Sequence, residues 1–278
     1  MITMSDTLLS LSEVAKSFKD VHALTKVDLE IKSGQVVGLV GGNGAGKTTL
    51  LRLMAGVMEP SNGSILFRGE PVSSMRERLG VVPESTGLYS RLTAWENIRY
   101  HSRIYGIEDK IAWARVVHFA KMLDLIDALP RHTKGFSRGM RQKTALLRAL
   151  AHGPDILLLD EPTAGLDVTS ARTVRKLVGQ LRNEGGTVIY STHHLAEAQQ
   201  VCDRIVIVHN GSIRADGTPD ELLAMTNKET LEEAYVSLTA DKAKPRIEDN
   251  YKEGKLAKWW RLFLTGRTPK IQEGSEDE

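Results

Sequence analysis

Short, mostly apolar runs recur along the chain at VVGLV (36–40), DILLLD (155–160) and GTVIYST (186–192). Runs of this length, with little alternation of polar positions, are typical of strands that are buried on both faces. Because segments with helical spacing separate them, the three runs predict a parallel sheet in an α/β domain.

The segments around this predicted sheet have other periods. Apolar and polar residues alternate in LLSLSEVAKSF and HALTKVDLEI near the N-terminus, which predicts antiparallel strands. The turn-rich segment 59–72 adds a hairpin. Helical spacing dominates from about residue 94 to 129 and predicts a helical lobe inserted between the core strands.

Strand signals stop after about residue 225, where the chain becomes charged and ends in EGSEDE. We therefore expect a main domain at residues 5–225, with a helical subdomain at about 88–150, and a C-terminal extension at 226–278. The extension contains a basic amphipathic segment at about 252–270, in which Lys and Arg recur every three residues among Trp, Phe and Leu.

This amphipathic segment has two interpretations. Aromatic and basic side chains suit an anionic membrane surface, where each basic residue contributes about 1 kcal/mol. Four of them would assist membrane or partner binding without forming an anchor. Alternatively, the tryptophans pack on protein.

Composition limits the remaining classes. The 278 residues are 41% hydrophobic and 26% charged, enough for a sizeable core, and the net charge of +2 gives no bulk attraction to nucleic acid. Cys202 is the only cysteine, which excludes an intrachain disulfide and suits a reducing cytosol. With no leader pattern and no apolar run near 20 residues, we expect a water-soluble chain whose membrane role, if any, comes through a partner.

The first apolar run leads into a glycine-rich loop that fits the pattern G-x-x-x-x-G-K-[ST]. Glycines allow the backbone to turn several N–H groups inward, and the following helix adds its positive N-terminus, so the loop predicts a nest for phosphates. Lys47 would reach the β- and γ-phosphates, Thr48 would help to hold Mg²⁺, and Thr49 would contact the α-phosphate. The alternative is a glycine-rich turn that binds nothing. The predicted nucleotide-binding residues here are Gly41, Gly42, Asn43, Gly44, Ala45, Gly46, Lys47, Thr48 and Thr49.

The second run ends in two carboxylates. Asp160 is predicted to hold Mg²⁺ directly or through water, and Glu161 to orient and deprotonate an attacking water. His193, the first histidine after the third run, is in a position to bond the γ-phosphate, whereas His194 is expected to face solvent or the next helix. The alternative is a strand that simply ends in acidic residues.

The order of the motifs GGNGAGKTT, VVPE, FSRGMRQK, ILLLDEPTAGLD and STHH resembles the nucleotide-binding subunit of ATP-binding cassette (ABC) transporters over residues 8–223. The resemblance implies a P-loop NTPase cassette with a RecA-like core, an antiparallel β subdomain and an inserted helical subdomain. It also implies ATP and Mg²⁺ as cofactors and an ATPase that powers export through a separate membrane permease. Such a subunit works at the cytoplasmic face of the membrane and binds no nucleic acid.

The same resemblance implies further roles. Phe18 occupies the position of an aromatic residue that stacks on adenine, the alternative being a strand residue facing the core. Ser137 and Gly139 lie in the signature segment, which covers the γ-phosphate held by a second copy in a head-to-tail dimer. Asp167 resembles the residue that couples the two sites, and His193 matches the switch histidine. The catalytic set is therefore Glu161, His193 and Lys47.

The chain departs from the family pattern at three points. Gly42 stands where proline is common, which loosens the phosphate loop. Glu84 replaces the usual glutamine, and although a carboxylate can ligate Mg²⁺ together with Thr48 and Asp160, it adds negative charge near the phosphates. The signature lacks its second glycine and its glutamine.

The branch that this chain resembles serves exporters of sodium ions, drugs, lipids, polysaccharides or haem-related cargo, and the cargo itself is not encoded here. The lobe after Glu84 is expected to contact the permease, with Tyr89 and Trp95 either as contacts or as packing residues. Two alternative functions are a soluble ABC ATPase in translation or DNA repair, and a nucleotide-binding regulator without hydrolysis.

Overall fold

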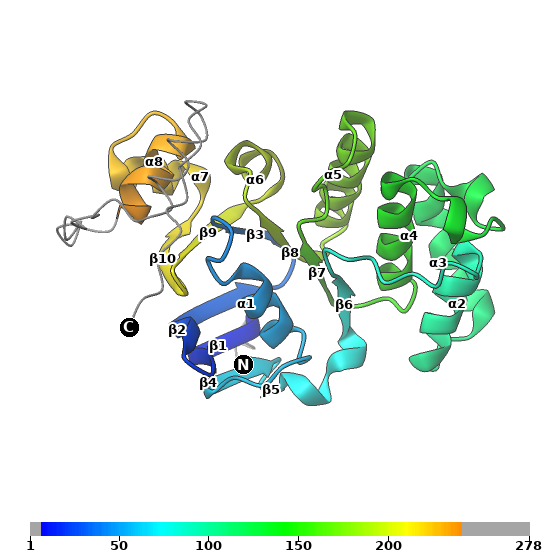
Figure 1. Ribbon diagram of the computed structural model, residues 1–278, viewed down its shortest axis with the longest axis horizontal. Coiled ribbons are helices and arrows are strands. Elements are labelled where there is room, and N and C mark those ends of the chain that lie inside the picture. The colour runs from blue at the N-terminus through cyan, green and yellow to red at the C-terminus, as the bar shows by residue number, and fades with distance from the viewer. Residues whose placement is uncertain (1–6, 241–278) are drawn as a thin grey trace, which may run out of the picture. The chain divides into compact units, whose positions relative to one another are not determined.

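The short apolar runs form the centre of a six-stranded sheet in the computed structural model, which describes residues 7–240 (Figure 1). The strand order is β10-β9-β3-β8-β7-β6. Strands β6, β7, β8, β3 and β9 run parallel, and β10 is antiparallel to β9. The predicted parallel sheet is therefore confirmed, with three strands added to the predicted ones. The strands are β3 (Val36–Val40), β6 (Leu79–Val82), β7 (Ile156–Asp160), β8 (Thr187–Thr192), β9 (Arg204–His209) and β10 (Ser212–Gly217).

A second, antiparallel sheet with the order β2-β1-β4-β5 contains the alternating N-terminal segments and the predicted hairpin. Strands β1 and β2 are long, and their alternate residues face a shared core. The prediction of an antiparallel β subdomain is confirmed. Its strands are β1 (Thr7–Phe18), β2 (Val21–Lys32), β4 (Asn62–Phe67) and β5 (Glu70–Pro71).

The helical lobe is inserted between β6 and β7, as expected, and lies beyond the β6 edge of the sheet (Figure 1). Its first helix begins with a capping box in which Thr93 and Glu96 satisfy each other's backbone N–H groups. The helices are α1 (Lys47–Met54), α2 (Ala94–Ile104), α3 (Asp109–Met122), α4 (Arg138–Leu150), α5 (Val168–Asn183), α6 (Leu195–Val201), α7 (Pro219–Thr226) and α8 (Leu231–Thr239). Short 3-10 turns occupy Val72–Ser74, Arg76–Arg78, Ile126–Ala128 and Thr133–Gly135.

Two hydrophobic cores meet at the central sheet. In β3, Val36 and Val40 belong to the core shared with the helices, whereas Val37 and Leu39 belong to the core shared with the antiparallel sheet and α1. Strands β7, β8 and β9 divide their residues in the same way. This two-sided burial explains why the sequence of these strands lacks a clear alternation.

The compact unit extends to Thr239, so the boundary expected at 225/226 falls inside it. Helix α8 lies beyond that boundary, and its Leu231 and Ala234 are buried in the core shared with the helices. Short helices carry little periodic signal, which is why the sequence pattern did not separate α8 from the charged segment. The predicted amphipathic segment at 252–270 lies outside the described residues. Within residues 7–240, no helix is both long and apolar enough to cross a membrane.

Candidate functional site

The glycine-rich loop occupies residues 41–46, between the end of β3 and the first residue of α1. Gly44 and Gly46 have φ angles of 78° and 109°, a region that L side chains rarely adopt. A Cβ on Gly41 would lie only 2.3 Å from the carbonyl oxygen of Val208 in β9. The sheet and the turn therefore both require glycine, and they bring the amides of the loop to the N-terminus of α1, where an anion is stabilised.

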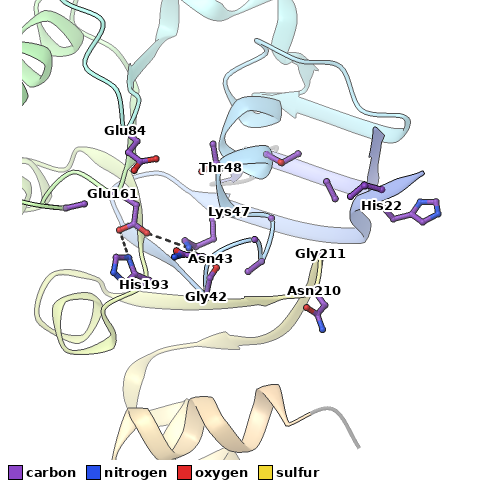
Figure 2. A pocket seen from close by; sticks show the side chains of 17 residues that line it. His22, Gly42, Asn43, Lys47, Thr48, Glu84, Glu161, His193, Asn210 and Gly211 are labelled. Carbon is purple, nitrogen blue, oxygen red and sulfur yellow. Dashed lines mark hydrogen bonds and ion pairs between the residues drawn. The ribbon is translucent and has the colours of Figure 1, made fainter. Parts of the chain in front are cut away.

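This loop forms one wall of a cavity of about 650 Å³ (Figure 2). That volume lies within the range of about 300–1,000 Å³ that small-molecule sites occupy. The opposite walls come from the β1–β2 turn region, the β9–β10 turn and the carboxyl ends of the central strands. The cavity is lined by Val21, His22, Ala23, Gly42, Asn43, Gly44, Ala45, Gly46, Lys47, Thr48, Thr49, Glu84, Glu161, Ala164, His193, Asn210 and Gly211.

Lys47 is buried at the base of this cavity. Its Nζ donates to the carbonyl oxygens of Gly41 at 2.8 Å and Gly42 at 3.2 Å, and lies 3.6 Å from Glu161 Oε1. The ammonium group thus lies next to the loop amides. A bound phosphate would replace the two carbonyl oxygens as the acceptor for Lys47 Nζ. All predicted loop residues except Gly41 line the cavity, and Gly41 supplies the carbonyl behind it.

The two predicted carboxylates lie at the end of β7 in different environments. Asp160 is buried, and its Oδ1 has no hydrogen-bond partner among the described residues. Burial raises the pKa of Asp160, the nearby charges of Glu161 and Glu84 raise it further, and the hydroxyls of Thr48 and Ser191 oppose the shift. An unpartnered carboxylate oxygen beside a threonine hydroxyl is a donor set of hard oxygens, which fits Mg²⁺.

Glu161 adopts a left-handed backbone conformation with φ of 48°, and its N–H donates to the carbonyl oxygen of Ser191 at 3.1 Å. Its carboxylate is largely buried and lies 2.9 Å from His193 Nδ1. Figure 2 shows Glu161, Lys47 and His193 directed toward one another across the loop. The structure therefore brings together the three residues predicted to be catalytic.

Three further residues considered from the sequence, Glu84, Phe18 and His194, are exposed. Glu84 follows β6, is exposed and lines the cavity near Glu161. Phe18 pairs with Val21 at the end of the β1–β2 hairpin and is 43% exposed, so it does not face the core. It is absent from the lining among the described residues, whereas His22 and Val21 are present. His194 is exposed and precedes α6, as expected.

The signature residues Ser137 and Gly139 are not among the described residues that line this cavity. Ser137 caps α4 by accepting a hydrogen bond from the Met140 N–H at 3.2 Å. Asp167 caps α5 by accepting from the Ser170 N–H at 2.9 Å, and this bond lowers the pKa of Asp167. A Cβ on Gly139 would lie 2.5 Å from Ser170 Oγ, so the starts of α4 and α5 are in close contact.

The two candidate contacts in the helical lobe differ in environment. Tyr89 is 56% exposed, and its ring meets Tyr100 edge to face. Trp95 is partly buried against the core and meets Trp113 edge to face, which fits a packing role.

Glu197, a buried carboxylate on α6, is not among the residues predicted from the sequence. It accepts from Thr163 Oγ1 at 2.8 Å and from Thr192 Oγ1 at 3.1 Å, and it pairs with Arg175 at 3.3 Å. Thr163 lies two residues after Glu161, and Thr192 directly precedes His193. Glu197 therefore connects the two segments that carry these catalytic residues. Its links span up to 34 residues, and no local motif signals them.

We expect Glu197→Ala to lower the free energy of unfolding by about 2–4 kcal/mol, because it leaves Arg175 and two hydroxyls without their acceptor. Urea denaturation measures the change. Glu184→Ala removes an exposed carboxylate at the end of α5 and serves as the control, with an expected change within about 0.5 kcal/mol. Equal losses in the two variants would contradict the role of Glu197.

A parallel sheet that feeds a glycine loop into a helix N-terminus, beside a buried acidic residue, defines the P-loop nucleotide-binding proteins. Within this class, the family model described as "ABC transporter" matches residues 24–164. The chain belongs to the ABC transporter family, as an ATP-binding subunit with ATPase activity.

Curated proteins that are similar to this chain agree with this assignment. The chain is 39% identical to the ABC transporter ATP-binding protein NatA of Bacillus subtilis over 239 residues, 83% of this chain and 97% of that protein. It is 34% identical to a Nod factor export ATP-binding protein I of Cupriavidus pinatubonensis over 220 residues, 78% of this chain and 68% of that protein.

Solved structures give the same result. An ATP-binding subunit of an ABC transporter has a TM-score of 0.77 at 31% identity, covering 84% of this chain and 99% of that one. A dimeric ATP-binding cassette in a post-hydrolysis state with ADP and Pi has a TM-score of 0.70 at 26% identity, covering 76% and 98%. The expected ABC fold and ATPase activity are confirmed, and the alternatives of a translation or repair ATPase and of a non-hydrolytic regulator are wrong.

Proposed function

We propose that this chain is the motor of an exporter whose membrane-spanning part is a separate permease, and that it works at the cytoplasmic face of the membrane. Two copies, arranged head to tail, enclose two ATP molecules, and closure and reopening of this dimer drive the permease. The observation that carries the proposal is the meeting of Lys47, Glu161 and His193 in one cavity. Relatives of this chain include a Nod factor export ATP-binding protein and a probable multidrug ABC transporter ATP-binding protein, which supports the export role.

Each catalytic residue has a task that follows from its position. The loop amides and Lys47 bind the phosphates, with the lysine at the β- and γ-phosphates. Glu161 takes a proton from the attacking water, and His193, bonded to the same carboxylate, orients it and donates to the γ-phosphate. His193 is 40% exposed, so its free edge is open to an incoming phosphate.

Thr48 and Asp160 are the residues that would hold Mg²⁺, with Glu84 at the rim of the cavity. The ion would neutralise charge on the β- and γ-phosphates. In the described part of the chain, no cluster of three or more His, Cys, Asp or Glu side chains is suited to a metal ion. Mg²⁺ is commonly held by one or two carboxylates together with substrate phosphates, and Asp160 with Thr48 supplies protein oxygens of this kind.

The signature segment is proposed to act on the second copy. Ser137 and Gly139 at the start of α4 would cover the γ-phosphate bound by that copy, and Asp167 would couple the two sites. The contact between the starts of α4 and α5 supports this coupling, since it joins the signature to the segment that follows Glu161. Phe18 is proposed to stack on adenine at the open end of the cavity, beside His22.

Affinity purification of the full chain from detergent-solubilised membranes of its host tests the transport role. We expect a polytopic membrane protein in an equimolar complex, and reconstitution of that complex in liposomes should stimulate phosphate release relative to the chain alone. A full chain with Glu161→Gln is the control that lacks turnover. Equal ATPase rates with and without the membrane protein, or ribosomal proteins as the sole stoichiometric partners, would contradict the proposal.

A further inference from the structure

Gly42, in the phosphate loop, makes a hydrogen bond to a distant part of the chain. Its backbone N–H donates to the hydroxyl oxygen of Tyr235 at 3.1 Å, across 193 positions of sequence. Gly42 is itself exposed, and a Cβ placed on it would meet only this hydroxyl, at 3.8 Å. Few neighbouring atoms therefore pack against Gly42, and the hydrogen bond to Tyr235 is a contact that can fix the position of its backbone.

The carbonyl of the same residue is also occupied. It accepts from the Ala45 N–H at 3.2 Å and from Lys47 Nζ at 3.2 Å. The N–H of Gly42 is thus bonded to Tyr235, while its carbonyl is bonded to the lysine that binds phosphate. Rotation about φ or ψ of Gly42 changes the orientation of these two contacts relative to each other, so the bond to the tyrosine hydroxyl limits where the carbonyl can hold the ammonium group.

Helix α8 holds that hydroxyl firmly. Leu231 and Ala234 are buried, and Tyr235 and Leu238 pack against the same core. The helix begins with a hydrogen bond from the Glu233 N–H to Thr230 Oγ1 at 3.3 Å. It also contacts α6, α7 and β10. The hydroxyl of Tyr235 therefore projects from an anchored element onto a loop that contains two consecutive glycines.

We propose that Tyr235 is a positioning residue for ATP binding, which holds the backbone of Gly42 in the conformation that presents Lys47 to the phosphates. It acts through Gly42, since Tyr235 is not among the described residues that line the cavity. Glycine has the largest conformational freedom to lose on ordering, and a loop that is already ordered loses less on binding. The proposal concerns ATP binding alone and does not depend on the direction of transport.

The test is a double-mutant cycle in the full chain. Tyr235→Phe keeps the ring and removes the acceptor, and we expect it to raise the KM for ATP and the Kd for ATP by about three- to tenfold with kcat nearly unchanged, the effect of one net hydrogen bond. Gly42→Pro removes the donor but restricts φ by its ring. In the G42P background the bond is already absent and the proline Cδ takes the place of the amide hydrogen against the tyrosine hydroxyl, so Y235F should not raise the Kd any further.

Val236→Ala is the matched control, since Val236 is exposed on the same helix, and it should leave the Kd unchanged. Thermal unfolding of each variant separates loss of fold from loss of affinity. An unchanged Kd in Y235F with Gly42 present would overturn the proposal. So would the same loss of affinity in both backgrounds, because the tyrosine would then act by another route.

Discussion

Replacing Glu161 by Gln is expected to lower the rate of ATP hydrolysis by about a hundredfold or more while ATP binding persists. The amide keeps the shape of the side chain but cannot accept the proton of the attacking water. It also removes a negative charge that lies 3.6 Å from Lys47 Nζ, beside the place where phosphate binds. Phosphate release under saturating Mg·ATP measures the first effect, and equilibrium binding of ATP measures the second.

The same variant should form a stable dimer with ATP, since the step that reopens the dimer is blocked. Sedimentation at increasing ATP concentration measures this association. Glu70→Gln, an exposed carboxylate on β5, is the control and should hydrolyse ATP like the wild-type chain. Turnover close to wild type in Glu161→Gln would exclude Glu161 as the base, and a monomer at saturating ATP would contradict the head-to-tail dimer.

Lys47→Ala should abolish measurable ATP binding at millimolar nucleotide, and hydrolysis with it. The loop amides remain in this variant, but the only ammonium group among the described residues of the cavity lining is lost, and a charged hydrogen bond to phosphate is about twice as strong as a neutral one. Calorimetric titration with Mg·ATP measures the change. Because the side chain is 7% exposed and bonded to two carbonyls, a small loss of stability is also expected.

Lys32→Ala removes an exposed lysine at the end of β2 and controls for a change in overall charge. It should bind ATP normally. If Lys47→Ala binds ATP with less than a tenfold loss while remaining folded, the amide nest alone carries the affinity and the role assigned to the lysine is wrong.

Much of the fold follows from local pattern. The strands that precede the glycine loop and the acidic pair are buried on both faces, so their sequences are apolar throughout and easily recognised. Strand β6 has only four residues, and the β9–β10 hairpin at the other edge lies in a region without a strong motif. Short elements at the edges of a sheet carry too few residues for a period to be evident.

The candidate site divides in a similar way. Gly46 and Glu161 could be predicted from the sequence, because each lies in a recognisable local pattern: Gly46 in the glycine-rich loop, and Glu161 directly after an apolar strand. Glu197 and Tyr235 are not marked, because Glu197 joins segments up to 34 residues apart and Tyr235 contacts the phosphate loop across 193 positions. Their roles depend on tertiary packing, which a single sequence does not display.

The sharing of strands between the two cores has a consequence for how the protein unfolds. Since β3, β7, β8 and β9 each contribute alternate residues to both sides, neither half can melt while the other stays intact. Heat or denaturant should therefore dismantle the cassette up to residue 239 in one cooperative event, and the nucleotide pocket should vanish with it rather than survive in a partly folded remnant.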